Sequence, residues 1–550
     1  MKKPRTMIIG LDGATFDLIE PLREAGFLPN LSRLMQQGTY GQLQTFPNFN
    51  SAAAWSSMVT GYNPGQHGVY DFGDGIPQKG SAWHPTTAAD RQKEPFWRLL
   101  STAGQRVGVM NVPISYPADH LNGFMLAGMD TPSLASKGFA QPPEILDELR
   151  RQGIDYLIDV PNLGEFRRRN ATQLPDAVSH MIESRARTVL HLMKTHPCDV
   201  MMAVFVAPDR VQHQFYPQEN TPIEHPSWLA VRSVYQQLDA FLGELLKTID
   251  EETSLLIVSD HGFGIVRPAT RLLNQLFAEI GLLTFRKHRG LKSRGLANLL
   301  AYGRKIVPKS LQRPLALAFP GLLRRAGAEM KYPALDWSQT KVFVDPHGNR
   351  VIINLRGRQP QGIVSPDDYE SLRDEVQKIL HQVTDPLTNR PVLLGAHKRE
   401  ALFHGPYTDK AGDLLMEWNY EVVRDTLQYT DGNQSLVVKP RQELQSPWKG
   451  NHRPAGIFIA RGSRIKAGEQ IADANICDIA PTVLYLQGQP VFSDMDGKVL
   501  TAIFTDEQLR RQAVQRCEPT ATTTTAAGAG LDADETRAIE ERLRDLGYLE

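Results

Sequence analysis

The side chains best suited to chemistry in this sequence are carboxylates and imidazoles scattered along the chain. Such ligands hold divalent zinc or manganese, and a site for two ions needs about six of them. The six candidate ligands are Asp12, Asp209, His213, Asp260, His261 and His452. The adjacent Asp-His pair and the Asp-x-x-x-His spacing are the most specific signals. Each residue alone also fits a turn, a helix cap or a surface position, so the hypothesis depends on all six occurring together.

Ser51 is a candidate nucleophile. It follows Asn50, a residue type that caps helices, and it precedes three alanines, which are strong helix formers. Thr60 and Gly61 are typical of a helix end, so we predict a helix that begins at Ser51. A hydroxyl at a helix N-terminus faces free N–H groups and the positive end of the helix dipole, which favour an alkoxide and a bound phosphate. A serine at this position is more often only a cap, and the candidate metal ligands are what make it a candidate nucleophile.

Buried strands are predicted just before most of the candidate ligands. The apolar, β-branched runs that indicate them span residues 6–11, 198–206 and 254–258. Asp12, Asp209 and the pair Asp260-His261 follow these runs. Because the carboxyl ends of parallel strands meet at one crevice, we expect these side chains to converge.

Helical patterns alternate with the strands. They cover residues 16–25, 31–37, 96–103, 177–195, 225–249 and 367–383. This alternation predicts an α/β fold with a mainly parallel sheet covered by helices. We place Asp209 and His213 where their strand passes into a loop, and His452 in the segment before a further strand at residues 457–460. A hairpin is predicted within residues 341–355.

The composition excludes few classes of protein. Lys+Arg and Asp+Glu both total 61, so the net charge is 0 and no specific nucleic-acid binding is expected. The three cysteines, Cys198, Cys477 and Cys517, are far apart, which is typical of a reducing compartment. No apolar run reaches the roughly 18 residues that a membrane span needs. We interpret the first residues as a strand rather than an export signal, and expect a cytoplasmic protein.

Four segments are predicted along the chain. Residues 1–283 and 336–515 form two parts of one catalytic core, with residues 73–175 as a candidate lid. Residues 284–335 form a helical basic insertion, in which positions 286–325 hold eleven Lys or Arg and no acidic residue. This insertion is either a solvated basic face or a surface for an anionic ligand. Residues 516–550 combine a low-complexity linker with an amphipathic helix, which is a candidate contact for a homo-oligomer.

As a group, the motifs resemble the alkaline phosphatase superfamily, and most closely its type I phosphodiesterase/nucleotide pyrophosphatase branch. Within that branch, the chain is similar to bacterial and archaeal proteins described as predicted phosphohydrolases or phosphomutases. The resemblance covers most of the chain. It rests on residues 10–13, 51–68, 71–72, 209–213, 259–263, 354–358, 362–364, 452–456 and 546–549.

The resemblance implies an alkaline phosphatase-like three-layer sandwich with a mainly parallel central sheet. It also implies two divalent ions, Zn²⁺ or Mn²⁺, with Asp12, Asp260, His261 and the Ser51 oxygen on one. Asp209, His213 and His452 would hold the other. Ser51 lies ten residues before Gly61, the spacing at which relatives place their nucleophile. The expected activity is hydrolysis of a phosphate ester, by a phosphodiesterase or phosphatase, through a phosphoserine.

Other functions remain open at this level. A phosphomutase or phosphotransferase would pass the same phosphoryl group to an alcohol, and a non-catalytic binding protein would have lost ligands that are all present here. Sulfatases share the fold, but the segment at Ser51 lacks their Cys-x-Pro-x-Arg motif. Nucleotide pyrophosphatases carry a phosphate-contacting asparagine where this chain has Phe72, so a diester or nucleotide substrate is in question. We interpret His67 as structural.

Overall fold

A computed structural model describes most of the chain. The described residues are 4–47, 50–73, 84–161, 163–169, 171–286, 335–345, 348–432, 435–440, 448–519 and 531–546. Nearly all of the basic insertion predicted at 284–335 lies outside these residues, as do residues 520–530 of the predicted linker. The assignment of the insertion as a solvated face or an anionic surface therefore stays a prediction.

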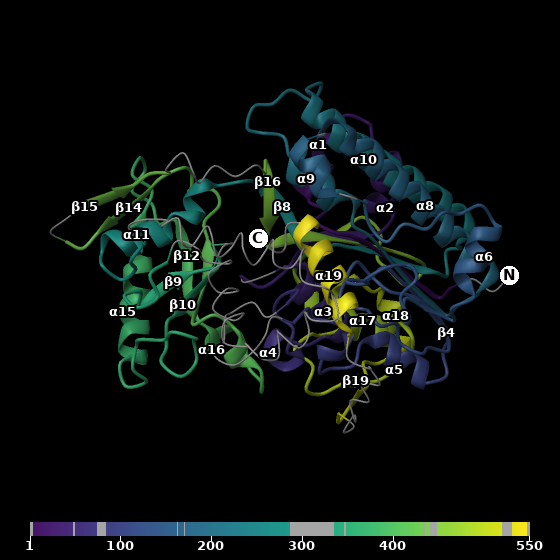
Figure 1. Ribbon diagram of the computed structural model, residues 1–550. Helices are drawn as coiled ribbons and strands as arrows, with labels where there is room; N and C mark the ends of the chain where they lie inside the picture. The colour runs from purple at the N-terminus through teal and green to yellow at the C-terminus, as the bar shows by residue number, and fades with distance from the viewer. Residues whose placement is uncertain are drawn as a thin grey trace.

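A nine-stranded, mainly parallel sheet forms the centre of the larger part of the molecule (Figure 1). Its parallel core, in spatial order, consists of β7 (Ser254–Val258), β1 (Thr6–Leu11), β6 (Val200–Phe205), β3 (Val107–Met110) and β4 (Gly123–Leu126). Beyond β7 lie the antiparallel β17 (Ala455–Arg461), then β2 (Thr39–Gln44) and β18 (Glu469–Asn475), and β5 (Ala140–Gln141) closes the other edge. Strands β1, β6 and β7 are buried along their whole length, as their apolar runs predict.

Helices cover both faces of this sheet (Figure 1). One face carries α1 (Phe16–Glu24), α2 (Pro29–Gln37), α8 (Leu174–Thr195), α9 (Ala207–Phe215) and α10 (Pro226–Thr248). The other carries α3 (Ser51–Thr60), α5 (Phe96–Thr102), α17 (Ile479–Leu486) and α18 (Asp506–Arg511). The three-layer α/β sandwich with a mainly parallel sheet is therefore confirmed. Among the helices that the described residues form, none is both long enough and apolar enough to cross a membrane.

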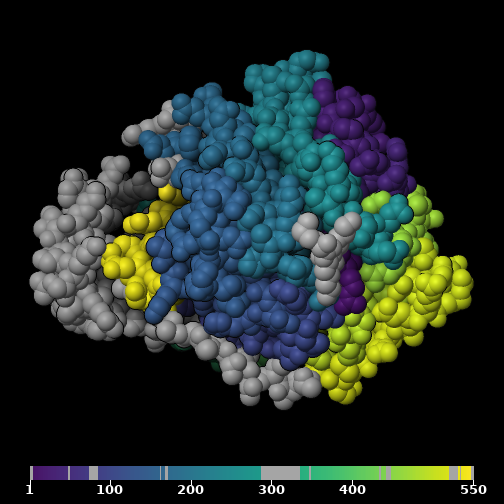
Figure 2. All heavy atoms as spheres, turned by 90° about the vertical axis from the view of Figure 1, so that its right-hand side faces the viewer, coloured from purple at the N-terminus to yellow at the C-terminus, as the bar shows by residue number. Residues whose placement is uncertain are grey.

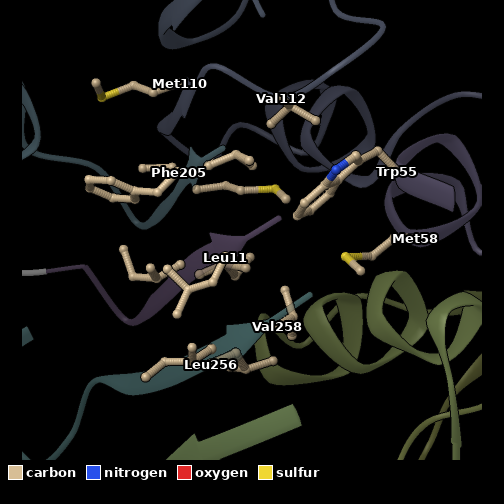
Figure 3. Close-up of a cluster of buried hydrophobic side chains, with 14 of the residues drawn as sticks. Leu11, Trp55, Met58, Met110, Val112, Phe205, Leu256 and Val258 are labelled. Atoms are coloured by element: carbon tan, nitrogen blue, oxygen red, sulfur yellow. The ribbon is translucent and has the colours of Figure 1, made fainter. Parts of the chain in front are cut away.

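The α3 helix packs directly on the ends of the central strands. Figure 3 shows Trp55 and Met58 of α3 beside Val112, Leu11 and Val258, and all five side chains are fully buried. Burying a side chain of this size stabilises the fold by about 1.5–3 kcal/mol. The core therefore fixes the position of the helix that begins with Ser51.

A second hydrophobic core forms a smaller part, on the left of Figure 1, from residues between Ala269 and Val438. One antiparallel sheet contains β12 (Leu393–Lys398), β13 (Leu414–Trp418), β10 (Arg350–Ile353) and β9 (Val342–Val344). Another contains β11 (Val383–Thr384), β14 (Leu427–Thr430) and β15 (Ser435–Val438), and the helices include α11 (Leu273–Glu279), α15 (Tyr369–His381) and α16 (Arg399–Leu402). The hairpin predicted at 341–355 corresponds to β9 and β10, which pair antiparallel. The predicted division at residues 283, 335 and 515 stays a prediction.

The two parts meet close to the start of α3. Arg350 Nη2 lies 2.9 Å from Asp71 Oδ2, and the rings of Tyr70 and Phe403 are 5.7 Å apart. The Tyr70 carbonyl in turn accepts a 2.8 Å hydrogen bond from the side chain of Asn50, the cap of α3. The smaller part therefore contacts Tyr70 and Asp71, and Tyr70 is hydrogen-bonded to the residue that caps α3.

Part of the candidate lid at residues 73–175 has regular secondary structure. Within this range, β4 and β5 belong to the central sheet, and the chain also forms α6 (Ile145–Arg151) and α7 (Leu163–Arg169). Strands of four and two residues are too short to show a clear period in the sequence. These two strands belong to the central sheet, and the lid at residues 73–175 stays a prediction.

The C-terminal helix α19 (Ala533–Leu546) packs on its own chain. Its apolar stripe, Ile539, Leu543 and Leu546, is no more than 3% exposed, and Arg542 Nη2 donates a 3.3 Å hydrogen bond to the carbonyl of Pro132. In Figure 2, α19 is the bright yellow segment on the left, and it lies directly against the blue surface. The apolar stripe of α19 is therefore already buried within the chain, and a homo-oligomer contact through this helix stays a prediction.

Candidate metal centre

Three of the predicted ligands form one group at the end of β6. Asp209 and His213 lie one turn apart on α9, so they share a face of the helix. The distance from Asp209 Oδ2 is 3.3 Å to His213 Nε2 and 3.1 Å to His452 Nε2, and the two imidazole nitrogens are 3.3 Å apart. Asp209 is fully buried and His213 is 3% exposed.

The elements that carry this group differ from the expectation. Asp209 and His213 were placed in a loop, but α9 begins at Ala207, because Pro208 sits in its first turn, where proline favours a helix. His452 lies on the strand β16 (Gly450–Arg453), which pairs antiparallel with β8 (Gly262–Ile265). A four-residue polar strand has no apolar alternation, so the sequence does not indicate it.

The other predicted residues form a second group. Asp12 follows β1 and the pair Asp260-His261 follows the neighbouring strand β7. His261 Nε2 lies 3.3 Å from Ser51 Oγ, 3.4 Å from Asp260 Oδ2 and 3.7 Å from Asp12 Oδ1. All four side chains are buried.

The two groups are in contact. The rings of His261 and His452 stack with their centroids 3.8 Å apart. One ligand atom each from Asp12, Asp209 and His261 lies within 4.8 Å of the others, so Asp209 is within reach of both groups rather than one. The structure thus brings all seven predicted residues together at the carboxyl ends of the parallel strands. That they bind metal stays a prediction.

The buried carboxylates fit a cation. Asp12 Oδ1 and Asp260 Oδ2 have no hydrogen-bond partner among the residues that the structure describes, and a buried carboxylate oxygen that lacks a hydrogen bond is costly. Burial, together with the neighbouring carboxylates, raises the pKa of Asp12 well above its usual range, and burial raises that of Asp260. A cation between these oxygens would remove the cost, and the nitrogen and oxygen donors suit Zn²⁺ or Mn²⁺. The residues present therefore fit two divalent ions.

The imidazoles are held in a form that can bind metal. His213 Nδ1 contacts the carbonyl of Gly450 at 3.1 Å, and His261 Nδ1 contacts that of Gly262 at 2.9 Å. A proton on Nδ1 makes Nε2 the ring nitrogen that can donate its lone pair to a metal. Burial and the neighbouring His261 hold the pKa of His452 well below its usual range, which favours the neutral imidazole.

The carboxylates are also oriented by residues to which the sequence analysis assigned no role. Trp55 Nε1 donates a 3.0 Å hydrogen bond to Asp12 Oδ2, and the backbone N–H of Gly13 donates to Asp260 Oδ1 at 3.3 Å. Arg210 donates to Asp209 Oδ1. All three residues lie inside the motifs on which the resemblance rests, and this position in the sequence is the signal that could have indicated their role.

Ser51 is the first residue of α3, as predicted. The side chain of Asn50 accepts a 3.1 Å hydrogen bond from the N–H of Ala53, and Gly61 ends the helix with φ 79°. This local structure points the Ser51 hydroxyl at His261, so the candidate nucleophile belongs to the second group.

His67 lies apart from the candidate ligands. Its Nδ1 accepts a 3.1 Å hydrogen bond from the N–H of Val69, and its Nε2 is 2.8 Å from Ser57 Oγ. Burial, with the nearby Arg91, lowers the pKa of His67 to about 3. These contacts support a structural role for a neutral His67.

His67 should make the stability depend on pH. The unfolded chain takes up a proton near pH 6.5 but the folded protein only near pH 3, so stability is full above pH 6.5 and falls as the pH drops towards 3. Between pH 8 and pH 5 we expect wild type to lose about 2 kcal/mol more than His67→Gln. Denaturant unfolding of both proteins at the two pH values measures this difference. An equal loss in both proteins would show that folded His67 protonates freely.

This chain is similar to one protein family and to several proteins of known structure. The family described as type I phosphodiesterase / nucleotide pyrophosphatase matches residues 6–432. An inactive murine ectonucleotide pyrophosphatase/phosphodiesterase 5 in complex with AMP is 11% identical, with 92% of this chain and 100% of that chain covered and a TM-score of 0.46. Phosphonoacetate hydrolase from Sinorhizobium meliloti 1021, in complex with phosphonoformate, is 13% identical, with 87% and 94% covered and a TM-score of 0.48.

No relative was found among the curated proteins. The family match spans well over half of the chain, from β1 to the end of β14. This protein therefore belongs to the type I phosphodiesterase/nucleotide pyrophosphatase family and is a hydrolase of phosphoester bonds.

Proposed function

We propose that the protein is a two-metal-dependent phosphoester hydrolase that works through a phosphoserine on Ser51. The observation that carries this proposal is the position of the Ser51 hydroxyl. It lies 3.3 Å from His261 Nε2, in a group that also contains two buried carboxylate oxygens without hydrogen-bond partners among the described residues. A hydroxyl at a cation site on a helix N-terminus is suited to attack a phosphoryl group.

The ligands divide into two sets in this proposal. Asp12, Asp260, His261 and Ser51 would hold one ion. Asp209, His213 and His452 would hold the other. When bound, the ions would supply positive charge that polarises the phosphoryl group and lowers the pKa of the serine hydroxyl.

The reaction that these residues support has two steps. Ser51 Oγ attacks phosphorus, the ester bond to the leaving alcohol breaks, and phosphoserine forms. Water then attacks the same phosphorus, which releases the phosphate product and restores the Ser51 hydroxyl. The N-terminus of α3 directs the positive end of its dipole towards the phosphoryl group throughout.

The substrate is a phosphate ester in this proposal, and neither a diester nor a nucleotide is assumed. Phe72 stands where nucleotide pyrophosphatases carry a phosphate-contacting asparagine, and its side chain is 1% exposed. Phenylalanine donates no hydrogen bond, so that contact to a nucleotide diester is lost here. Monoesters therefore belong among the substrates to be tested.

A screen of the purified protein with Zn²⁺ or Mn²⁺ tests this function. We expect p-nitrophenol release from p-nitrophenyl phosphate, from bis(p-nitrophenyl) phosphate, or from both. A hydrolase releases its phosphate product to water even when glycerol is added, whereas a phosphotransferase would phosphorylate the glycerol. Turnover of no mono- or diester with either ion would contradict the proposal.

We also propose a cytoplasmic location. The three cysteines Cys198, Cys477 and Cys517 form no disulfide in the structure, and two of them are buried. Widely spaced cysteines that form no disulfide with one another are typical of proteins in a reducing compartment, which supports this proposal.

A further inference from the structure

Arg210 lies buried between two carboxylates. It follows Asp209 on α9, and its side chain is 1% exposed. Its Nη2 lies 2.8 Å from Asp159 Oδ2, and its Nε donates to the same carboxylate at 3.1 and 3.3 Å. Its Nη1 donates to Asp209 Oδ1 on the other side. The planar guanidinium has donors on both edges, so it can bridge two carboxylates in a way that lysine cannot.

The two carboxylate oxygens of Asp209 have different partners. Oδ1 is bound by Arg210, while Oδ2 faces His452 Nε2 at 3.1 Å and His213 Nε2 at 3.3 Å. A carboxylate held at one oxygen has lost its freedom to rotate. Oδ2 of Asp209 is therefore fixed towards the two imidazoles before any ion arrives.

The charges in this arrangement balance. A guanidinium beside a cation site would by itself repel the cation, and the repulsion is strong where water is excluded. The Asp159 side chain is only 5% exposed, and it places a compensating negative charge on the far side of Arg210. The pair of Arg210 and Asp159 can therefore orient Asp209 without adding net positive charge.

The pair is also anchored. Asp159 Oδ1 accepts a 2.7 Å hydrogen bond from the N–H of Val160, and Arg210 Nη2 lies 3.3 Å from Met129 Sδ. The loop that carries Met129 continues to Thr131 and Pro132, whose carbonyls accept hydrogen bonds from Arg542 of α19. The guanidinium is therefore held by segments that pack around it.

We infer that Arg210, with Asp159 as its counter-charge, is a positioning residue that aims Asp209 at the ion held with His213 and His452. This inference rests on the proposed function, because it needs an ion at that group. In this role the buried guanidinium of Arg210 prepares one of the two ion sites, and Ser51 carries out the chemical step.

Titration of ion-free protein with Zn²⁺ by calorimetry tests the inference. In Arg210→Gln we expect one of the two ions to bind about 10- to 100-fold more weakly, the usual effect of losing a residue that orients a ligand. The second ion, at Asp12, Asp260 and His261, should bind with an affinity close to that in wild type. Two ions bound with wild-type affinities would overturn the inference.

Arg373 of α15 provides a matched control. It is also a buried arginine, 4% exposed, and it donates to a carboxylate, that of Glu400, at 3.2 and 2.6 Å, but it lies in the smaller part of the molecule. Arg373→Gln should destabilise the protein and leave both Zn²⁺ affinities unchanged. Equal weakening in Arg373→Gln and Arg210→Gln would show a general structural effect and would also overturn the inference.

Asp159→Asn keeps the inference testable if Arg210→Gln does not fold. This change removes the counter-charge at nearly constant size and leaves Arg210 positive beside the ion site. We expect about 10-fold weaker binding of the same single ion, and no change would contradict the role of the pair. A wild-type protein that binds no ion would instead refute the proposed function, so the two failures are distinguishable.

Discussion

Ser51→Ala should lower the rate of phosphoester hydrolysis by about 10⁴-fold or more, because it removes the oxygen that attacks phosphorus. The change deletes one atom from a fully buried side chain at the first position of α3. Six further candidate ligands remain, so both ions should still bind. Initial rates with the best substrate of the screen, together with calorimetric titration of Zn²⁺, measure the two effects separately.

Ser56→Ala is a matched control for this prediction. Ser56 lies on the same helix, is fully buried, and its Oγ has no hydrogen-bond partner among the residues that the structure describes. Its hydroxyl therefore stabilises nothing that alanine would lose, and the rate should stay at the wild-type level.

The phosphoserine itself can be observed. In acid-quenched reactions of the wild-type protein, mass spectrometry should find a phosphate on the peptide that contains Ser51, and none on that peptide in Ser51→Ala. A Ser51→Ala protein that hydrolyses substrate at the wild-type rate would show that water attacks phosphorus directly.

Removal of divalent ions by a chelator should abolish hydrolysis and destabilise the protein. Asp12, Asp209 and Asp260 are within 1% of complete burial, and two of their oxygens lack hydrogen-bond partners among the described residues. An ion at 100 times its Kd stabilises the folded state by about 2.7 kcal/mol, and two independent ions by about twice that. Thermal unfolding with the chelator, and again after Zn²⁺ or Mn²⁺ is restored, measures this contribution.

The stabilisation of the folded protein by the ions should increase as the pH rises. In the ion-free folded protein the pKa values of Asp12 and Asp260 are raised. At pH values above these raised pKa values, the two carboxylates destabilise the folded state relative to the unfolded chain. This destabilisation disappears at low pH, where both groups are protonated in the folded and in the unfolded protein. Protons compete with the ions for the same oxygens. The gain in Tm on adding Zn²⁺ should therefore be larger at pH 8 than at pH 5.

Asp12→Asn removes the negative charge of this side chain and keeps its shape, so it tests the contribution of the charge alone. This change keeps an oxygen that can accept the hydrogen bond from Trp55, and it removes one buried negative charge. Without ions, Asp12→Asn should unfold at a higher temperature than wild type, while the gain in Tm from Zn²⁺ should shrink. An ion-free Asp12→Asn protein that is less stable than ion-free wild type would contradict this account of the site.

Much of the fold could be predicted because its signals are local. The apolar runs of β1 and β7 match the observed strands residue for residue, since a buried strand must exclude polar side chains along its length. The bounds of α3 follow from Asn50 at one end and Gly61 at the other, because capping is decided within a few residues. Parallel topology then explains why Asp12 and Asp260 lie on neighbouring strand ends.

Other features depend on partners that are distant in the chain. His452 reaches the site because β16 pairs with β8, nearly two hundred residues earlier, and neither strand has a pattern that predicts the pairing. The Arg210–Asp159 bridge and the docking of α19 likewise join segments whose separate patterns are ordinary.

The sequence by itself thus determined which side chains could bind ions, the α/β class, and the helix that presents Ser51. Only the tertiary structure decided that Asp209 lies within reach of both groups, that one of its oxygens is held by a buried guanidinium, and that the apolar stripe of α19 is buried within its own chain. The physical reason is the range of the interactions. Caps and hydrophobic periods act over a few residues, whereas buried charges are placed by whichever distant segments the packing brings together.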